Sequence, residues 1–133
     1  MENKSNEATP QRPEGDRMLD ASLVTMDLNK LIEQVRTETT WKDSDRNSIT
    51  IFKSSTMRIV LLGLHEGAAL KIHTANGIIS VQVLEGHLKF TANGQTIDRQ
   101  KGEMLALQKQ VPHSVLAIKE TFFLLTLAMS EPA

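Results

Sequence analysis

Four histidines carry most of the chemistry open to this chain of 133 residues, because it contains no cysteine. Without a thiol there is no disulfide framework, no thiolate nucleophile and no cysteine-based zinc or iron–sulfur site. A neutral imidazole binds transition metals and also acts as a hydrogen-bond partner for a ligand or a water. The sequence has no glycine-rich phosphate loop, nucleophile elbow or paired-carboxylate pattern. Candidate chemistry therefore rests on imidazole.

Two of the histidines belong to stretches with a defined spacing. His73 follows Gly67 after five intervening residues, and the first stretch closes at Gly86. The second stretch begins at Gly102, which is followed by the acidic residue Glu103 and an apolar run. It ends at Pro112-His113. These two stretches resemble the paired motifs of the cupin superfamily, whose members are small antiparallel β-barrels of the jelly-roll kind. The resemblance covers roughly residues 46–127.

The resemblance implies where the site lies and which ligands it lacks. In the family's first motif a second histidine and a glutamate follow the first histidine, and here those positions hold Ala75 and Ile79. Cupin motif histidines point inward at one end of the barrel, where imidazoles and a carboxylate surround a divalent metal. The implied metal ligands in this chain are His73 and His113 alone. The implied pocket is lined by His73, Ala75, Ile79, Val81 and His113.

Three functions remain open for such a pocket. Catalytic zinc sites generally keep three protein ligands, so two imidazoles without a carboxylate hold a metal weakly. The favoured hypothesis is a module that binds a small apolar or amphipathic molecule, with the histidines as hydrogen-bond partners. The alternative is a metal-dependent enzyme of the oxygenase or isomerase type, which would use a divalent transition metal at His73 and His113. The third is a structural or regulatory role for a dimeric barrel.

Other polar and sulfur-containing side chains receive simpler interpretations. His65 and His87 fall outside the motif positions, and we expect them in solvent or at an interface. Lys71 shares the parity of the first motif histidine, which places it either near the pocket mouth or with its amine in solvent. Met57 and Met104 are expected to fill the core.

The elements that must position the site are strands, preceded by one helix. Residues 1–19 are polar and read as a disordered tail. In the segment 20–45, Asp27 caps a helix of apolar periodicity that ends near residues 37–40, and Trp41 packs this helix onto the barrel. Residues 46–130 form the barrel, with strands expected at 48–52, 57–64, 78–84, 104–107, 113–118 and 121–128.

Two local patterns support the all-β reading. Ile79, Val81 and Val83 alternate with polar residues, so they share one face of a strand. Asn93-Gly94 lies between two strand-like runs and is a strong hairpin signal, because both residues tolerate positive φ. The sequence therefore predicts an antiparallel double-stranded β-helix, or jelly-roll barrel, with a short N-terminal helix.

Composition limits the partners. Fifteen basic residues against sixteen acidic ones give a net charge of −1, which argues against nucleic-acid or membrane binding. The polar start and the lack of a long apolar run favour a soluble cytoplasmic protein. Pairing through edge strands predicts a homodimer, for which the apolar run Phe122–Leu125 offers interface material.

Overall fold

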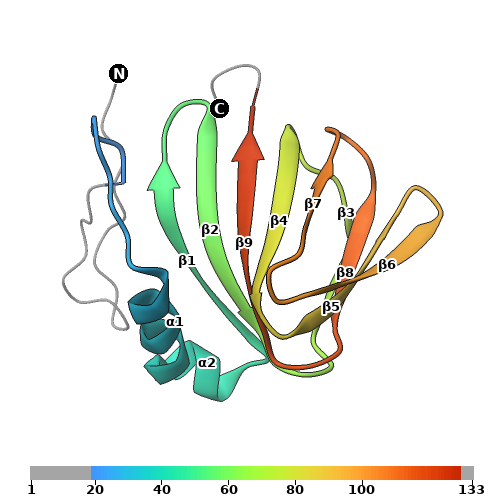
Figure 1. Ribbon diagram of the computed structural model, residues 1–133, viewed down its shortest axis with the longest axis horizontal. Helices are drawn as coiled ribbons and strands as arrows, with labels where there is room; N and C mark the ends of the chain where they lie inside the picture. The colour runs from blue at the N-terminus through green and yellow to red at the C-terminus, as the bar shows by residue number, and fades with distance from the viewer. Residues whose placement is uncertain (1–18, 130–133) are drawn as a thin grey trace.

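The computed structural model describes residues 19–129 as two antiparallel sheets, with two short helices against the first strands of one sheet (Figure 1). This architecture confirms the predicted all-β jelly roll with a short N-terminal helix. The tail predicted for residues 1–19 lies outside the described residues except for Leu19, which is buried. None of the helices between residues 19 and 129 is long and apolar enough to cross a membrane.

Each sheet draws on distant parts of the chain. The five-stranded sheet has the order β1-β2-β9-β4-β7, formed by Arg46–Lys53, Met57–Leu64, Thr121–Ala128, Ile78–Glu85 and Met104–Leu107. The four-stranded sheet has the order β3-β8-β5-β6, formed by Ala69–His73, His113–Ala117, His87–Ala92 and Gln95–Gln100. The first and second motif stretches therefore meet in the four-stranded sheet, where β3 pairs with β8.

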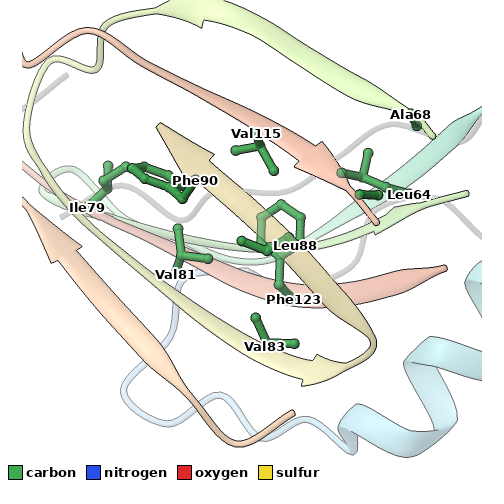
Figure 2. Packing of buried hydrophobic residues seen from close by; sticks show 10 residues of the cluster. Leu64, Ala68, Ile79, Val81, Val83, Leu88, Phe90, Val115 and Phe123 are labelled. Atoms are coloured by element: carbon green, nitrogen blue, oxygen red, sulfur yellow. The ribbon is translucent and has the colours of Figure 1, made fainter. Parts of the chain in front are cut away.

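The main core fills the space between the two sheets (Figure 2). Alternation along β4 sends Ile79, Val81 and Val83 inward, and all three are at most 3% exposed, as the sequence predicts. Facing residues of the four-stranded sheet complete the cluster. Its buried members are Leu64, Ala68, Ile79, Val81, Val83, Leu88, Phe90, Val115, Ala117 and Phe123.

A second core lies between the five-stranded sheet and the helices. The helix α1, Leu28–Thr37, begins where the Asp27 carboxylate accepts a hydrogen bond from the Lys30 amide, as predicted. A short helix α2, Thr39–Asp43, follows and carries Trp41. The indole ring packs against Phe122 of β9 with ring centroids 5.2 Å apart. Trp41 therefore fixes the helices to the sheet, which confirms its predicted packing role.

Three predictions about apolar side chains are wrong. Met57 and Met104 are 38% and 53% exposed, so they are not core filler. The run Phe122–Leu125 belongs to β9, the middle strand of the five-stranded sheet, and both phenylalanines are at most 1% exposed. Because one face of β9 meets the main core and the other meets the helices, this run offers no interface surface.

The predicted hairpin at Asn93-Gly94 joins β5 to β6. Both residues have positive φ, 52° and 74°, as a two-residue turn between right-twisted strands requires. The hairpin tip lies at the end of the four-stranded sheet where β8 begins, since Ala92 pairs with His113. The turn therefore borders the end of the molecule that holds the two motif histidines.

Candidate functional site

The structure brings the two motif histidines together. His73 is the last residue of β3 and His113 the first of β8, and they are direct partners in the antiparallel pairing. Their ring centroids lie 4.3 Å apart, with the planes inclined by 59°. Residues directly opposite in a sheet project to the same face, so both imidazoles lie on one side of the four-stranded sheet.

That side is the inner face. His113 also pairs with Ala92, which packs against the main core. Its ring stacks on the buried ring of Phe90, with centroids 5.4 Å apart and an angle of 11°. His113 is 4% exposed, whereas His73 is exposed. One imidazole is therefore buried against the core, and the other is exposed at the end of β3.

A β-bulge in β3 sets the direction of His73. Leu70 pairs with Val115 and His73 with His113, and the register shifts between these two pairs. Without the bulge, positions 70 and 73 would face opposite sides of the sheet. The same shift turns Lys71 outward, where it lines a groove on the outer face of the sheet. Of the two positions considered for Lys71, the structure therefore shows the one in solvent and not the one near the pocket mouth.

Hydrogen bonds fix which nitrogen of each imidazole carries the proton. Nδ1 of His73 lies 2.8 Å from the carbonyl oxygen of Lys71, and Nδ1 of His113 lies 2.9 Å from that of Val111. A carbonyl only accepts, so both Nδ1 atoms are donors. In the neutral rings Nε2 then keeps its lone pair. Within residues 19–129, neither Nε2 has a hydrogen-bond partner.

The donor set of this site does not fit a catalytic metal centre. Across residues 19–129, no cluster of three or more His, Cys, Asp or Glu side chains is placed to hold a metal ion. The two positions that would hold ligands in the family motif, Ala75 and Ile79, both pack against the core. Two nitrogen ligands fall short of the three protein ligands that catalytic zinc sites generally keep.

The remaining residues of the predicted pocket are part of the apolar core. Ile79 lies beside the ring of Phe90, and Val81 lies further along β4 toward Val83 (Figure 2). Both are at most 3% exposed. The surroundings of the histidine pair are thus apolar on the side of β4, as the sequence implies, and their use by a ligand stays a prediction.

The other two histidines have separate roles. Nε2 of His87 lies 2.7 Å from a carboxylate oxygen of Asp98 on the neighbouring strand. His65 stacks on Trp41 with centroids 3.6 Å apart, and its Nε2 donates to the Trp41 carbonyl at 2.8 Å. His65 therefore joins α2 to the end of β2. Sequence spacing gives no signal for this contact, because the two residues are 24 positions apart.

Comparisons with solved structures show that the chain shares its fold with cupin proteins. No family model and no curated protein sequence matches the chain. In structure, the chain is similar to a conserved protein of unknown function from Streptococcus pyogenes, at 20% identity and a TM-score of 0.65, over 85% of this chain and 93% of that one. It is also similar to a cupin superfamily protein from Desulfitobacterium hafniense, at 16% identity and a TM-score of 0.64, over 96% and 99% of the two chains.

A third similar structure is that of an enzyme. It is a salicylate 1,2-dioxygenase from Pseudaminobacter salicylatoxidans, at 22% identity and a TM-score of 0.58. The alignment covers 63% of this chain but only 26% of the dioxygenase chain. Such low identity supports a shared fold and carries no assignment of activity.

Proposed function

The chain has the cupin fold, and on that premise we propose that it binds a small apolar or amphipathic molecule at the open end between its sheets. In this function His73 and His113 accept hydrogen bonds from the ligand. The buried apolar residues of β4 and β5 support the rings from the core side. In this function the cupin barrel binds the ligand without catalysing a reaction.

The observation that carries this proposal is the pair of Nε2 lone pairs. Both rings donate Nδ1–H to the backbone, so each keeps an Nε2 acceptor that has no partner among residues 19–129. A net hydrogen bond of this kind is worth about 0.5–1.5 kcal/mol. Nε2 of His113 is not a fully buried atom, although the residue is only 4% exposed, so a ligand can reach it and donate that bond while the surrounding side chains favour an apolar body. A molecule with an apolar body and an N–H or O–H group meets both requirements.

The second candidate is a metal-dependent enzyme of the oxygenase or isomerase type. One observation favours it: metal-ligating histidines usually donate their other ring N–H to a carbonyl or carboxylate, as both histidines do here. The missing carboxylate and second motif histidine oppose it, because Ala75 and Ile79 have no group that binds a metal. A module for small molecules therefore fits the residues better.

Metal content separates the two candidates. The protein would be produced in medium supplemented with iron, manganese, nickel and zinc, and analysed for metals beside the His73→Ala variant. We expect well below one equivalent of any metal in both proteins. The His87→Ala variant is the control, because His87 lies on the outer face and bonds Asp98.

One equivalent of a single metal in the wild-type protein would overturn the proposal if it disappeared in His73→Ala and persisted in His87→Ala. That pattern would place the metal at the motif histidines and favour the enzyme. Equal loss in both variants would mark nonspecific binding to imidazole and leave the donor-set argument in place.

A further inference from the structure

Two cations lie side by side where β1 and β2 meet at their connecting turn. Lys53 is the last residue of β1, Arg58 is the second of β2, and the two are direct partners in the antiparallel pairing. Like charges directly opposite each other in a sheet are destabilising. Within residues 19–129 neither side chain forms an ion pair or a hydrogen bond. This includes Asp20, although the carbonyl of its neighbour Leu19 accepts a hydrogen bond from the Lys53 amide.

The pair lies on the face of the five-stranded sheet that carries the main core. By alternation along β2, Arg58 and Val60 share this face with Leu62, which packs against that core. The β9 partners of the first two are Leu127 and Leu125, which also pack against it. We call Val60, Leu125 and Leu127 the aliphatic strip. It leads from the guanidinium toward the core.

This part of the face is open to a ligand. The strand β1 is an edge of its sheet, and in Figure 1 the strands β3, β8 and β6 lie beyond β7, on the side away from β1. Ser48 is exposed on the face of β1 opposite to Ile49, which packs beneath the helices. Lys53 and Arg58 are themselves only partly buried. The four-stranded sheet therefore leaves this margin uncovered.

The environment of the Arg58 guanidinium favours a carboxylate. Its Nε is buried without a partner, whereas its two Nη atoms are not buried and can donate to a ligand. A charge partly removed from water attracts a counter-ion more strongly, because less solvent screens it. Arginine N–H groups bind the oxygens of carboxylates and phosphates. Beside aliphatic side chains, the single charge of a carboxylate costs less to desolvate than the double charge of a phosphate.

We infer that Lys53 and Arg58 form a binding site for the carboxylate of an amphipathic molecule whose apolar part lies along the aliphatic strip. The carboxylate bridges the two cations and offsets their repulsion. This inference goes beyond the proposed function and does not depend on it, because the site contains neither motif histidine.

A titration of the whole chain tests the ligand class, followed by the methyl NMR signals of the aliphatic strip. The probes are octanoate, 1-octanol, acetate and inorganic phosphate. We expect octanoate to shift these signals and to bind at least tenfold more tightly than each of the other three, since one charged hydrogen bond or a few buried methylene groups account for such a factor. Equal affinity for 1-octanol would overturn the carboxylate as the recognised group, and equal affinity for acetate would overturn the role of the strip.

Charge-neutralising variants localise the carboxylate. Arg58→Gln is expected to weaken octanoate at least tenfold, and Lys53→Gln about threefold, because an exposed lysine forms weaker contacts than a partly desolvated arginine. Arg99→Gln is the matched control: it removes the same charge, and the Nε of Arg99 is likewise buried without a partner, but Arg99 lies on β6 of the other sheet. Its affinity for octanoate should stay within twofold of the wild type. Equal losses in Arg58→Gln and Arg99→Gln would overturn the site.

The stability of the ligand-free protein separates a binding pair from a structural one. Because the two cations repel each other, Lys53→Gln should raise the Tm by about 1–3 °C while it weakens octanoate. A lower Tm with unchanged octanoate affinity would overturn the inference and give the pair a structural role. His113→Phe should bind octanoate within twofold of the wild type. A tenfold loss there, with none in Arg58→Gln, would move the carboxylate to the histidines and overturn this site while keeping theirs.

Discussion

At the scale of single residues, burial makes the two imidazoles unequal. His113 is 4% exposed and stacks on Phe90, whereas His73 is exposed at the end of β3. A hydrogen bond to a largely buried ring competes with less water than one at the surface, so it is worth more. His113 should therefore contribute more to ligand affinity than His73.

Replacement of His113 by phenylalanine tests this ranking. The variant keeps a planar ring against Phe90 but has no nitrogen acceptor. As probes of the proposed function, 4-methylphenol has an apolar ring and one O–H donor, and toluene has the same ring without a donor. We expect 4-methylphenol to bind the variant about fivefold more weakly, with the affinity for toluene unchanged, because about 1 kcal/mol of hydrogen bonding is lost. The His73→Phe variant should lose less. Calorimetry on both variants measures the difference, and a greater loss at His73 would contradict the ranking.

The residue types predicted the apolar side of the site, but they did not predict the hydrogen bonds of its histidines. Ala75 and Ile79 could be recognised as replacements for metal ligands because the glycines and histidines around them keep their spacing. The bulge in β3 could not be recognised, because an inserted residue reverses parity without a mark in the sequence. The two backbone carbonyls that fix the ring tautomers also depend on local backbone geometry.

At the scale of elements, the turn before β5 holds the sheets in place. Gly86 has a φ of 98°, and a Cβ atom there would collide with the backbone of Glu120 and Thr121. The Thr121 hydroxyl lies within hydrogen-bond distance of both the backbone amide and the backbone carbonyl of His87, the residue after Gly86. Gly94 has a similar positive φ of 74°, but a Cβ there would meet open space. Comparison of the two glycines therefore separates the cost of a positive φ, which both positions share, from the cost of a steric clash, which only Gly86 has.

Alanine at each glycine gives a matched comparison. Gly94→Ala should cost about 1–2 kcal/mol of unfolding free energy, from the left-handed conformation alone. Gly86→Ala should cost about 1–3 kcal/mol more, because the methyl group must also displace backbone atoms. Urea denaturation of the two variants measures the difference. Equal costs would show that the close approach at Gly86 has no energetic effect.

Strands with a strong apolar pattern could be predicted closely, and polar or short ones could not. The expected ranges 104–107 and 121–128 coincide with β7 and β9. The hairpin signal implied a strand after Gly94, but the bounds of β6 could not be predicted, because Gln95–Gln100 is mostly polar and lies at a sheet edge. The strand β3 has five residues and a bulge, which obscures its period of two.

At the scale of the whole molecule, β9 joins two hydrophobic cores. Phe123 faces the core between the sheets, and Phe122 faces the core beneath the helices. Trp41 closes the second core from α2 and stacks on His65. The helices are therefore part of the cooperative structure, because their removal would expose one face of the central strand.

Truncation of Trp41 tests this dependence. We expect Trp41→Ala to lower the unfolding free energy by about 3–5 kcal/mol, as usual for a buried aromatic residue. Trp41→Phe should lower it less, because a ring still covers Phe122. Denaturation followed by circular dichroism gives both values. A loss below about 1 kcal/mol in Trp41→Ala would mean that the helices are dispensable to the barrel.

Because the run Phe122–Leu125 packs into the two cores, the predicted homodimer would have to form through a different surface. Ile72 and Leu116 are 74% and 40% exposed, and both line the groove on the outer face of the four-stranded sheet. The strand β3 is also the edge of that sheet. We expect pairing through this face and a monomer for Leu116→Glu in sedimentation velocity. A wild-type protein that is monomeric at high concentration would contradict the prediction.

The account as a whole depends on the two imidazoles acting as hydrogen-bond acceptors, and ligand affinity before and after metal removal tests this directly. Calorimetry would compare the binding of 4-methylphenol to protein stripped with a chelator and to the same protein supplied with iron or zinc. The account predicts binding to the stripped protein, with an affinity that metal changes by less than twofold. Binding that appears only after metal is added would contradict it.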